Sequence, residues 1–251
     1  MSDRPVLEAR ALHKAFGALE VTRSVSLALA RGARHAVVGP NGSGKTTLFN
    51  LLAGEVRPDR GQVLIDGTDV TRKPPNVRAR AGLARSFQKN NLFPNLSVRE
   101  NIAIALTIGE RRSGIFWRRF DRLPDLEERI VALARRVRVE AMLDHEVRAL
   151  PYGTQRQVEV GLALAIAPKI LLLDEPTAGM SAEETREMTA LVASLPGDIA
   201  ILIVEHDMDV VFEIAERITV LDYGSVLIEG TRDEVRRSDV VRRRYFGERV
   251  A

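Results

Sequence analysis

The sequence predicts an α/β protein with a mostly parallel sheet and helices on both of its faces. Three observations support this class. Short apolar runs of strand length alternate with amphipathic stretches, a glycine-rich loop joins an early strand to a helix, and one charged helical segment interrupts the alternation. At 251 residues the chain is long enough for one large domain, or for a core with one inserted subdomain.

The chain up to residue 88 is expected to be mainly strands. Apolar or alternating residues predict strands over 6–12, 25–29, 36–38, 61–65 and 83–87. A helix is expected over 46–53, closed by Gly54, because glycine favours the conformation that follows a helix end. Residues 74–76, Pro-Pro-Asn, predict a loop.

A helical subdomain is expected over 89–150, where the chain becomes charged and amphipathic. Ser97 and Glu100 stand three residues apart, as in a capping box, and predict a helix through about residue 105. Apolar residues at helical spacing predict a second helix over 126–138, after an irregular basic stretch over 109–121. The nucleotide-binding core is then expected in two parts, 1–88 and 151–251.

Alternation of strands and helices resumes after residue 150. Strands are expected over 170–173 and 199–204, and a hairpin over 218–221 and 225–229. Helices are expected over 155–167, 182–194, 208–215 and, at the basic end of the chain, 233–246.

Bulk composition excludes several classes of protein. Hydrophobic residues make up 45% and charged residues 28%, as in ordinary globular proteins. No cysteine is present, which excludes disulfides and thiolate metal sites. We expect neither a signal peptide nor a bilayer span, because the first residues lack an apolar region and no apolar run approaches roughly 18 residues. The net charge is only +3, and the local arginine clusters are interpreted as solvated helix faces, with contact to a membrane partner or lipid headgroups as the next alternative and nucleic acid as the last.

A phosphate-binding loop is predicted between the strand at 36–38 and the helix at 46–53. Its glycines let successive backbone N–H groups converge on an anion, and the helix N-terminus adds partial positive charge. The lysine can reach the β- and γ-phosphates, and the threonine hydroxyl can bind Mg²⁺. The predicted nucleotide-binding residues here are Gly39, Pro40, Asn41, Gly42, Ser43, Gly44, Lys45, Thr46 and Thr47. The loop alone leaves GTPases, kinases, RecA-like ATPases and ABC-type ATPases open.

Three further residues at strand ends narrow the choice. Asp174 and Glu175 follow the apolar strand at 170–173, so they are expected beside the phosphate loop at the carboxyl edge of the sheet. Asp174 fits the role of the carboxylate that binds Mg²⁺ through water, and Glu175 can polarise an attacking water. His206 ends the next strand, where an imidazole can hold the γ-phosphate and the water.

With these residues in this order, the chain resembles the ATP-binding subunits of ABC transporters over nearly its whole length. Phe16 stands where that family places the aromatic residue that stacks on adenine. Gln88 stands where that family has the glutamine that senses Mg²⁺ and contacts the membrane subunit. Residues 150–155, Leu-Pro-Tyr-Gly-Thr-Gln, take the place of the family signature, and residues 176–181 form the loop that touches the other subunit.

The sequence departs from the family pattern in the signature and in this loop. Pro151 replaces a serine whose hydroxyl donates to the γ-phosphate held by the opposite subunit, and Tyr152 replaces the first glycine, whereas Gly153 is retained. Ser181 replaces a common aspartate. These departures, with residues 204–208 and 241–247, resemble the branched-chain and hydrophobic amino acid uptake ATPases. ATPases of urea and aromatic-acid uptake look alike at these positions.

The resemblance implies a P-loop NTPase (RecA-like) core with an N-terminal antiparallel β subdomain and an inserted α-helical subdomain. It implies ATP and Mg²⁺ as cofactors, with Thr46, Gln88 and Asp174 on the metal and Glu175 and His206 catalytic. It also implies integral membrane permease subunits, a second identical or related ATPase subunit, indirect contact with a solute-binding protein, and a place on the cytoplasmic face of the cell membrane. Leu92, Phe93 and Leu96 are candidate permease contacts, with ordinary core packing as the alternative. A soluble nucleic-acid-associated ABC ATPase and a non-catalytic scaffold remain as alternatives, although no nucleic acid is expected.

Overall fold

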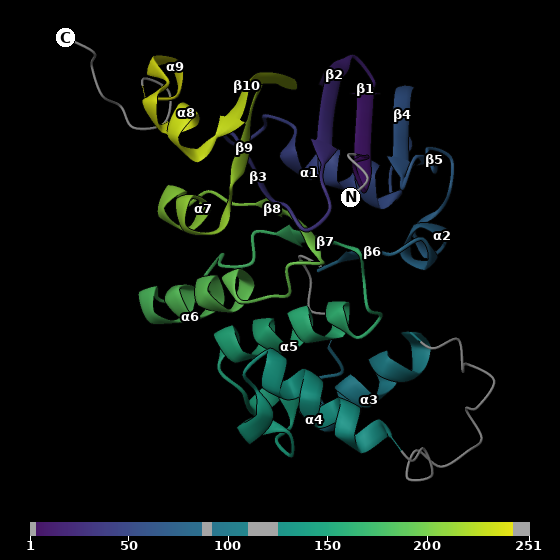
Figure 1. The fold of residues 1–251 in the computed structure, drawn as a ribbon, viewed down its shortest axis with the longest axis vertical. Coiled ribbons are helices and arrows are strands. Elements are labelled where there is room, and N and C mark those ends of the chain that lie inside the picture. Colours follow the sequence, from purple (N-terminus) through teal and green to yellow (C-terminus); the bar gives the residue numbers. More distant parts are fainter. Residues whose placement is uncertain (1–3, 87–91, 110–124, 243–251) are drawn as a thin grey trace.

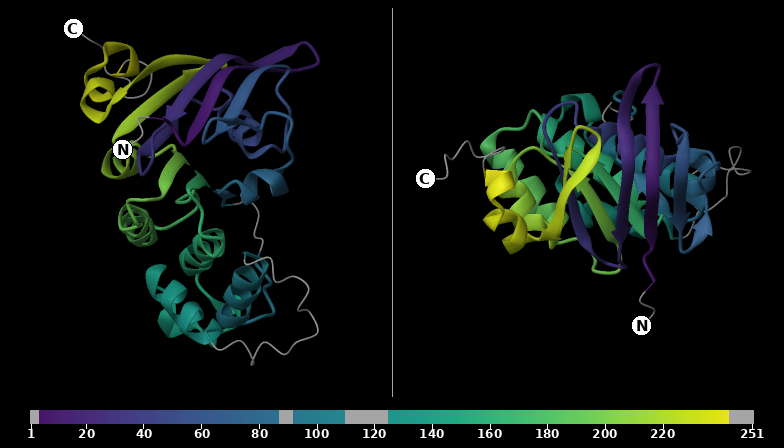
Figure 2. Two further views of the ribbon diagram at one scale, coloured as in Figure 1. Left: turned by 45° about the vertical axis from the view of Figure 1, so that its right-hand side comes forward. Right: turned by 90° about the horizontal axis from the view of Figure 1, so that it is seen from above.

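The computed structural model describes residues 4–86, 92–109 and 125–242. Two β-sheets lie one above the other at one end of the molecule, and a group of helices lies at the other end (Figure 1). Figure 2 shows from a second side that the sheet nearest the N-terminus is far from helices α3 and α4. The α/β architecture predicted from the sequence is confirmed.

The larger sheet has six strands, in the order β10-β9-β3-β8-β7-β6. Its neighbouring strands run parallel except for β9 and β10, which form the predicted hairpin. The strands are β3 (Arg34–Val38), β6 (Leu83–Arg85), β7 (Ile170–Asp174), β8 (Ala200–Val204), β9 (Arg217–Asp222) and β10 (Ser225–Thr231). Because β3, β7 and β8 are parallel neighbours, the loops that follow them meet at one edge of the sheet.

The smaller sheet is antiparallel throughout, with the order β2-β1-β4-β5. Its strands are β1 (Leu7–Phe16), β2 (Leu19–Leu29), β4 (Arg60–Ile65) and β5 (Thr68–Asp69). It forms the N-terminal β subdomain that the resemblance implied.

Helix α1 (Lys45–Ala53) lies between the two sheets (Figure 1). Its apolar residues share one core with the smaller sheet and with one face of the larger, including Val37, Leu172 and Leu202. The alternate residues of the same strands, including Ala36, Leu171 and Ile203, face a second core on the opposite side. Both faces of the parallel strands are therefore buried, which explains why they are continuously apolar rather than alternating.

The second core is covered by helices from the rest of the chain. These are α3 (Val98–Gly109), α4 (Leu126–Arg136), α5 (Tyr152–Leu164), α6 (Ala182–Ala193) and α7 (Met208–Ile214), with 3₁₀ turns over Glu140–Met142 and Val147–Ala149. Ser97 and Glu100 make the predicted reciprocal bonds before α3. Within the described residues, no helix combines the length and hydropathy that a bilayer span requires.

The loop predicted over 74–76 is wrong, because α2 (Pro75–Arg80) begins there. Proline is favoured in the first turn of a helix, where its missing N–H leaves no bond unmade. The helix places Arg78, fully buried, against the end of α1, where its guanidinium donates to the carbonyls of Leu51 and Leu52, both at 2.6 Å. Burial lowers the pKa of Arg78 to about 10.

The predicted terminal helix over 233–246 is also wrong as one element. The chain forms α8 (Arg232–Arg237) and α9 (Asp239–Val241), separated by an extended Ser238. Serine favours such a break because its side chain competes for backbone hydrogen bonds. Residues 243–246 lie outside the described part.

Candidate functional site

The phosphate loop runs from the end of β3 into α1, as predicted. Gly42 and Gly44 adopt positive φ angles of 80° and 102°, which residues with a side chain rarely adopt. Gly39 has no room for a side chain, since a Cβ there would lie 2.5 Å from the carbonyl oxygen of Leu221. These constraints give the loop its turn and the backbone curvature suited to a phosphate.

The β9–β10 turn and β2 hold the loop from the side. Gly224 donates its N–H to the carbonyl of Ser43 at 3.0 Å, and Arg23 donates its N–H to the carbonyl of Gly224 at 2.6 Å. A Cβ on Gly44 would lie 2.6 Å from the carbonyl oxygen of Val21. The loop is therefore fixed between segments that lie far apart in the sequence.

Lys45 lies buried over the loop. Its Nζ donates to the carbonyls of Gly39 at 2.7 Å and Pro40 at 3.1 Å. Burial lowers the pKa of Lys45, whereas the negative charges of Glu175 and Asp174 oppose the shift. A buried cation whose hydrogen bonds go only to neutral carbonyls is well suited to bind a phosphate.

Asp174 ends β7 in a fully buried position. Its Oδ2 accepts from Arg85 at 2.7 Å, whereas its Oδ1 is buried without a hydrogen-bond partner. Burial raises the pKa of Asp174, and the nearby Arg85 opposes the rise. An unpartnered buried carboxylate oxygen is costly, and a hydrated Mg²⁺ would satisfy it.

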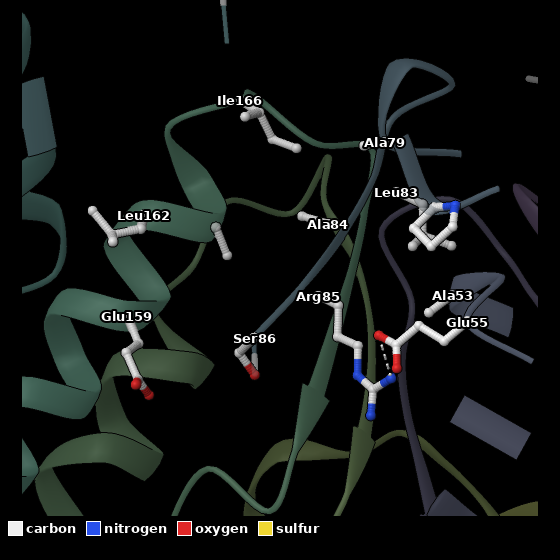
Figure 3. A pocket seen from close by; sticks show the side chains of 12 residues that line it. Ala53, Glu55, Ala79, Leu83, Ala84, Arg85, Ser86, Glu159, Leu162 and Ile166 are labelled. Carbon is white, nitrogen blue, oxygen red and sulfur yellow. Dashed lines mark hydrogen bonds and ion pairs between the residues drawn. The ribbon is translucent and has the colours of Figure 1, made fainter. Parts of the chain in front are cut away.

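Sequence reasoning missed Arg85, which gathers three elements around Asp174. From the end of β6 its guanidinium also donates to Asn50 of α1 at 2.7 Å. It donates to Glu55 at 3.0 Å as well, and Figure 3 shows this pair. The only sign of Arg85 in the sequence was a cation three residues before Gln88. Sequence spacing does not show that this cation meets the carboxylate of Asp174 on another strand.

We expect Arg85→Leu to lower the free energy of unfolding by about 3–5 kcal/mol, because it leaves a buried carboxylate unpaired. Denaturant unfolding followed by circular dichroism measures the change. Arg135→Leu is the matched control, since Arg135 pairs with Glu140 on the surface and its loss changes little. Equal stability of the two variants would show that the Arg85 pair is not needed.

Glu175 and His206 meet at the carboxyl edge of the sheet. Strands β7 and β8 are in register there, with Asp174 opposite Val204. Nε2 of His206 lies 2.7 Å from Oε1 of Glu175. Glu175 has a φ of 49°, a strained conformation for a residue with a side chain, and such strain clusters at functional sites.

Glu205 is a second residue that sequence reasoning left without a role. It is buried, and its Oε1 accepts from the N–H of Thr177 at 2.9 Å and from the Thr177 hydroxyl at 2.6 Å. Its Oε2 accepts from the N–H of His206 at 3.1 Å. Glu205 therefore connects the segment after Glu175 to the backbone that carries His206.

The structure places the signature residues at the start of α5. The helix begins at Tyr152, earlier than predicted, and Pro151 precedes it without a side-chain cap. The Tyr152 hydroxyl accepts from Arg156 at 2.9 Å, and Arg156 also pairs with the buried Glu159 at 2.7 Å. Gly153 donates its N–H to Glu184 of α6 at 2.9 Å.

The remaining predicted site residues have different placements. Thr46 is exposed and Thr47 half-buried in the first turn of α1, and Asn41 is exposed in the loop. Phe16 is 51% exposed at the end of β1, with Nζ of Lys14 5.4 Å from its ring centre. Gln88 lies outside the described residues.

The chain belongs to the ABC transporter family, whose sequence pattern matches residues 22–178. It is accordingly an ATP-binding protein and an ATPase.

Relatives match the chain from end to end. The high-affinity branched-chain amino acid transport ATP-binding protein BraF of Pseudomonas aeruginosa is 33% identical, with 98% of this chain and 99% of that protein covered. The corresponding protein LivG of Salmonella typhimurium is 34% identical at the same coverage. A ribose import ATP-binding protein of Streptomyces avermitilis is 37% identical, but the match covers only 46% of its length.

Solved structures support the same fold. An ATP-binding cassette of an ABC transporter in its ADP conformation superimposes with a TM-score of 0.84 at 27% identity, covering 97% of this chain and 99% of that one. A nucleotide-free cassette gives a TM-score of 0.79 at 25% identity, covering 97% and 96%.

Proposed function

We propose that the chain is the ATPase subunit of an importer for branched-chain or other hydrophobic amino acids, bound to the cytoplasmic face of the cell membrane. The proposal that the chain hydrolyses ATP with these residues rests mainly on the 2.7 Å contact between Glu175 and His206. This contact lies at the same edge of the sheet as Asp174 and the loop that contains Lys45. These groups provide what phosphoryl transfer to water requires: a phosphate cradle, a base and a hydrogen-bonding group for the γ-phosphate.

Nucleotide binding is assigned to the loop and its helix. The backbone N–H groups over 39–47 surround the phosphates, and Lys45 exchanges its loop carbonyls for the β- and γ-phosphate oxygens. Phe16 is assigned to the adenine, which suits its exposed ring. Mg²⁺ held by Thr46, Asp174 and Gln88 would neutralise charge that develops on the phosphates.

Catalysis is assigned to Glu175 and His206. Glu175 accepts a proton from the water that attacks the γ-phosphorus, and the bond to His206 fixes its carboxylate in position. The single Nε2–H of His206 can be shared between Glu175 and a γ-phosphate oxygen, so His206 links the base to the group transferred.

Complete active sites are proposed to require a second ATPase subunit. The N-terminus of α5, with Pro151, Tyr152 and Gly153, is assigned to the γ-phosphate bound by that subunit. Pro151 provides neither a hydroxyl nor an N–H, and the Gly153 N–H is bonded to Glu184, so the other free amides of the first turn and the helix dipole carry this contact. The altered signature favours pairing with a related paralogue over pairing of two identical chains.

The permease is proposed to dock at an apolar hollow of about 310 Å³ beside the nucleotide site (Figure 3). Leu83, Ala84 and Ser86 line one side of the hollow, and Leu162 and Ala163 of α5, with Ile166 just after the helix, line the other. The hollow suits an apolar helix of the membrane subunit. Of the three permease contacts suggested by the sequence, Leu92 is wrong because it is buried in the core, whereas Phe93 is exposed and Leu96 half-buried.

Reconstitution with the permease and the solute-binding protein tests the proposal. We expect leucine to stimulate ATP hydrolysis and to enter vesicles, whereas urea and an aromatic acid do neither. Ala163→Arg should keep basal hydrolysis but lose the stimulation, because it fills the hollow with a charge. Ala193→Arg, on the exposed end of α6, is the control. Failure of leucine with success of another solute would reject the assigned substrate, and stimulation of Ala163→Arg would reject the docking site.

A further inference from the structure

One carboxylate joins the start of α5, which is assigned above to the phosphate bound by a second subunit, to the loop over 176–181, which the family resemblance places against that subunit. Oε1 of Glu184 accepts from the N–H of Gly153 at 2.9 Å, and Oε2 accepts from the N–H of Ser181 at 2.9 Å. Gly153 belongs to the first turn of α5, and Ser181 ends the loop over 176–181. The two segments are therefore attached to the same side chain, which lies in the first turn of α6.

The fit at Gly153 is close. A Cβ added to Gly153 would lie 2.8 Å from both Cγ and Oε1 of Glu184, shorter than a real contact allows. The two segments also approach each other at Gly179, where an added Cβ would lie 3.7 Å from the Tyr152 ring. The signature turn and the loop over 176–181 are thus joined through Glu184 and lie close together beside it.

Pro151 explains why this helix end uses an acceptor from another helix. A serine at the N-cap accepts a hydrogen bond from the first turn, whereas Pro151 has no such group. Glu184 provides the missing acceptor for Gly153 and adds a negative charge at the positive end of α5. Hydrogen bonds from Ser181 and Gly153 lower the pKa of Glu184, so the acid is ionised.

We propose that Glu184 is a positioning residue that holds the first turn of α5 in register with the loop over 176–181, and so sets the rate at which the paired subunits hydrolyse ATP. This inference rests on the proposed function. The side chain acts through Gly153 and Ser181 and does not touch the nucleotide bound by its own chain.

Glu234 is a matched control. It completes the same kind of capping box in α8, and its hydrogen bonds within the described residues all go to Thr231. Glu184→Ala and Glu234→Ala therefore each remove a capping box, but only the first also disconnects two segments.

Amide exchange and kinetics together test the proposal. In Glu184→Ala the amides of Gly153 and Ser181 should exchange faster, whereas Glu234→Ala should accelerate only that of Thr231. The kcat should fall roughly ten- to a hundredfold in Glu184→Ala, as expected when reacting groups are misplaced, while the affinity of the single chain for Mg-ATP stays unchanged. Glu184→Gln should give an intermediate kcat, because its one carbonyl oxygen accepts only one of the two bonds.

A wild-type kcat in Glu184→Ala, with normal Mg-ATP binding, would overturn the inference and leave the proposed function intact. An equal loss of kcat in Glu234→Ala would also overturn it, because general destabilisation would then explain the effect. Absence of turnover in the wild-type protein would instead reject the proposed function.

Discussion

Lys45→Met is expected to weaken Mg-ATP binding by at least about a hundredfold. Lys45 is assigned one hydrogen bond to each of the β- and γ-phosphates, and a hydrogen bond to a charged group contributes about 1.5–3 kcal/mol. The two together amount to about 3–6 kcal/mol, and each 1.4 kcal/mol is a tenfold change in affinity. Lys45 is 5% exposed, so its ammonium meets the phosphates with little screening by water. Methionine keeps most of the buried stem and removes the ammonium, with its charge and its bonds to the carbonyls of Gly39 and Pro40, which separates nucleotide binding from packing.

Displacement of a fluorescent ATP analogue measures this affinity. Lys169→Met is the control, because Lys169 pairs with Asp66 at the surface. Both variants should keep the wild-type melting temperature. Unchanged nucleotide affinity in a folded Lys45→Met protein would show that the phosphates bind elsewhere.

Glu175→Gln is expected to retain ATP and to lose most of its hydrolysis, by about a hundred- to ten-thousandfold in kcat. The amide has the shape of the carboxylate and can still bond to His206, so the site keeps its geometry. It accepts no proton from the attacking water at neutral pH. The bound ATP therefore persists, and any pair of subunits that ATP stabilises should accumulate.

Single-turnover hydrolysis with radiolabelled ATP separates the chemical step from product release. Glu183→Gln is the control, since Glu183 is exposed in the first turn of α6. Hydrolysis at the wild-type rate by Glu175→Gln would exclude Glu175 as the base, and the role would then pass to another group near His206.

Most of the fold could be predicted from the sequence because the two signals used, apolar runs and glycine spacing, are local. Apolar runs identified β7 and β8, and glycine spacing identified the turn between β3 and α1 that is proposed to bind phosphate. Residues 74–76 were misread because Pro75 opens a helix as readily as it ends one, and only the buried contacts of Arg78 decide the outcome.

The candidate site was predictable where one motif contains the chemistry. Lys45, Asp174 and Glu175 fall within local patterns, and their strand ends meet as parallel topology requires. The side chains that hold Asp174 and Gly153 in place were not predictable. Arg85 contacts Asp174 across 89 residues of sequence, and Glu184 contacts Gly153 across 31. No local sequence pattern indicates that residues so far apart in the chain are in contact.

Calorimetric titration of the wild-type protein with Mg-ATP tests the central claim most directly, which is that the loop over 39–47 binds a nucleotide triphosphate. We expect a saturable heat at one site per chain that disappears in Lys45→Met. Absence of both heat and saturation, with protein shown to be folded by circular dichroism, would contradict the account.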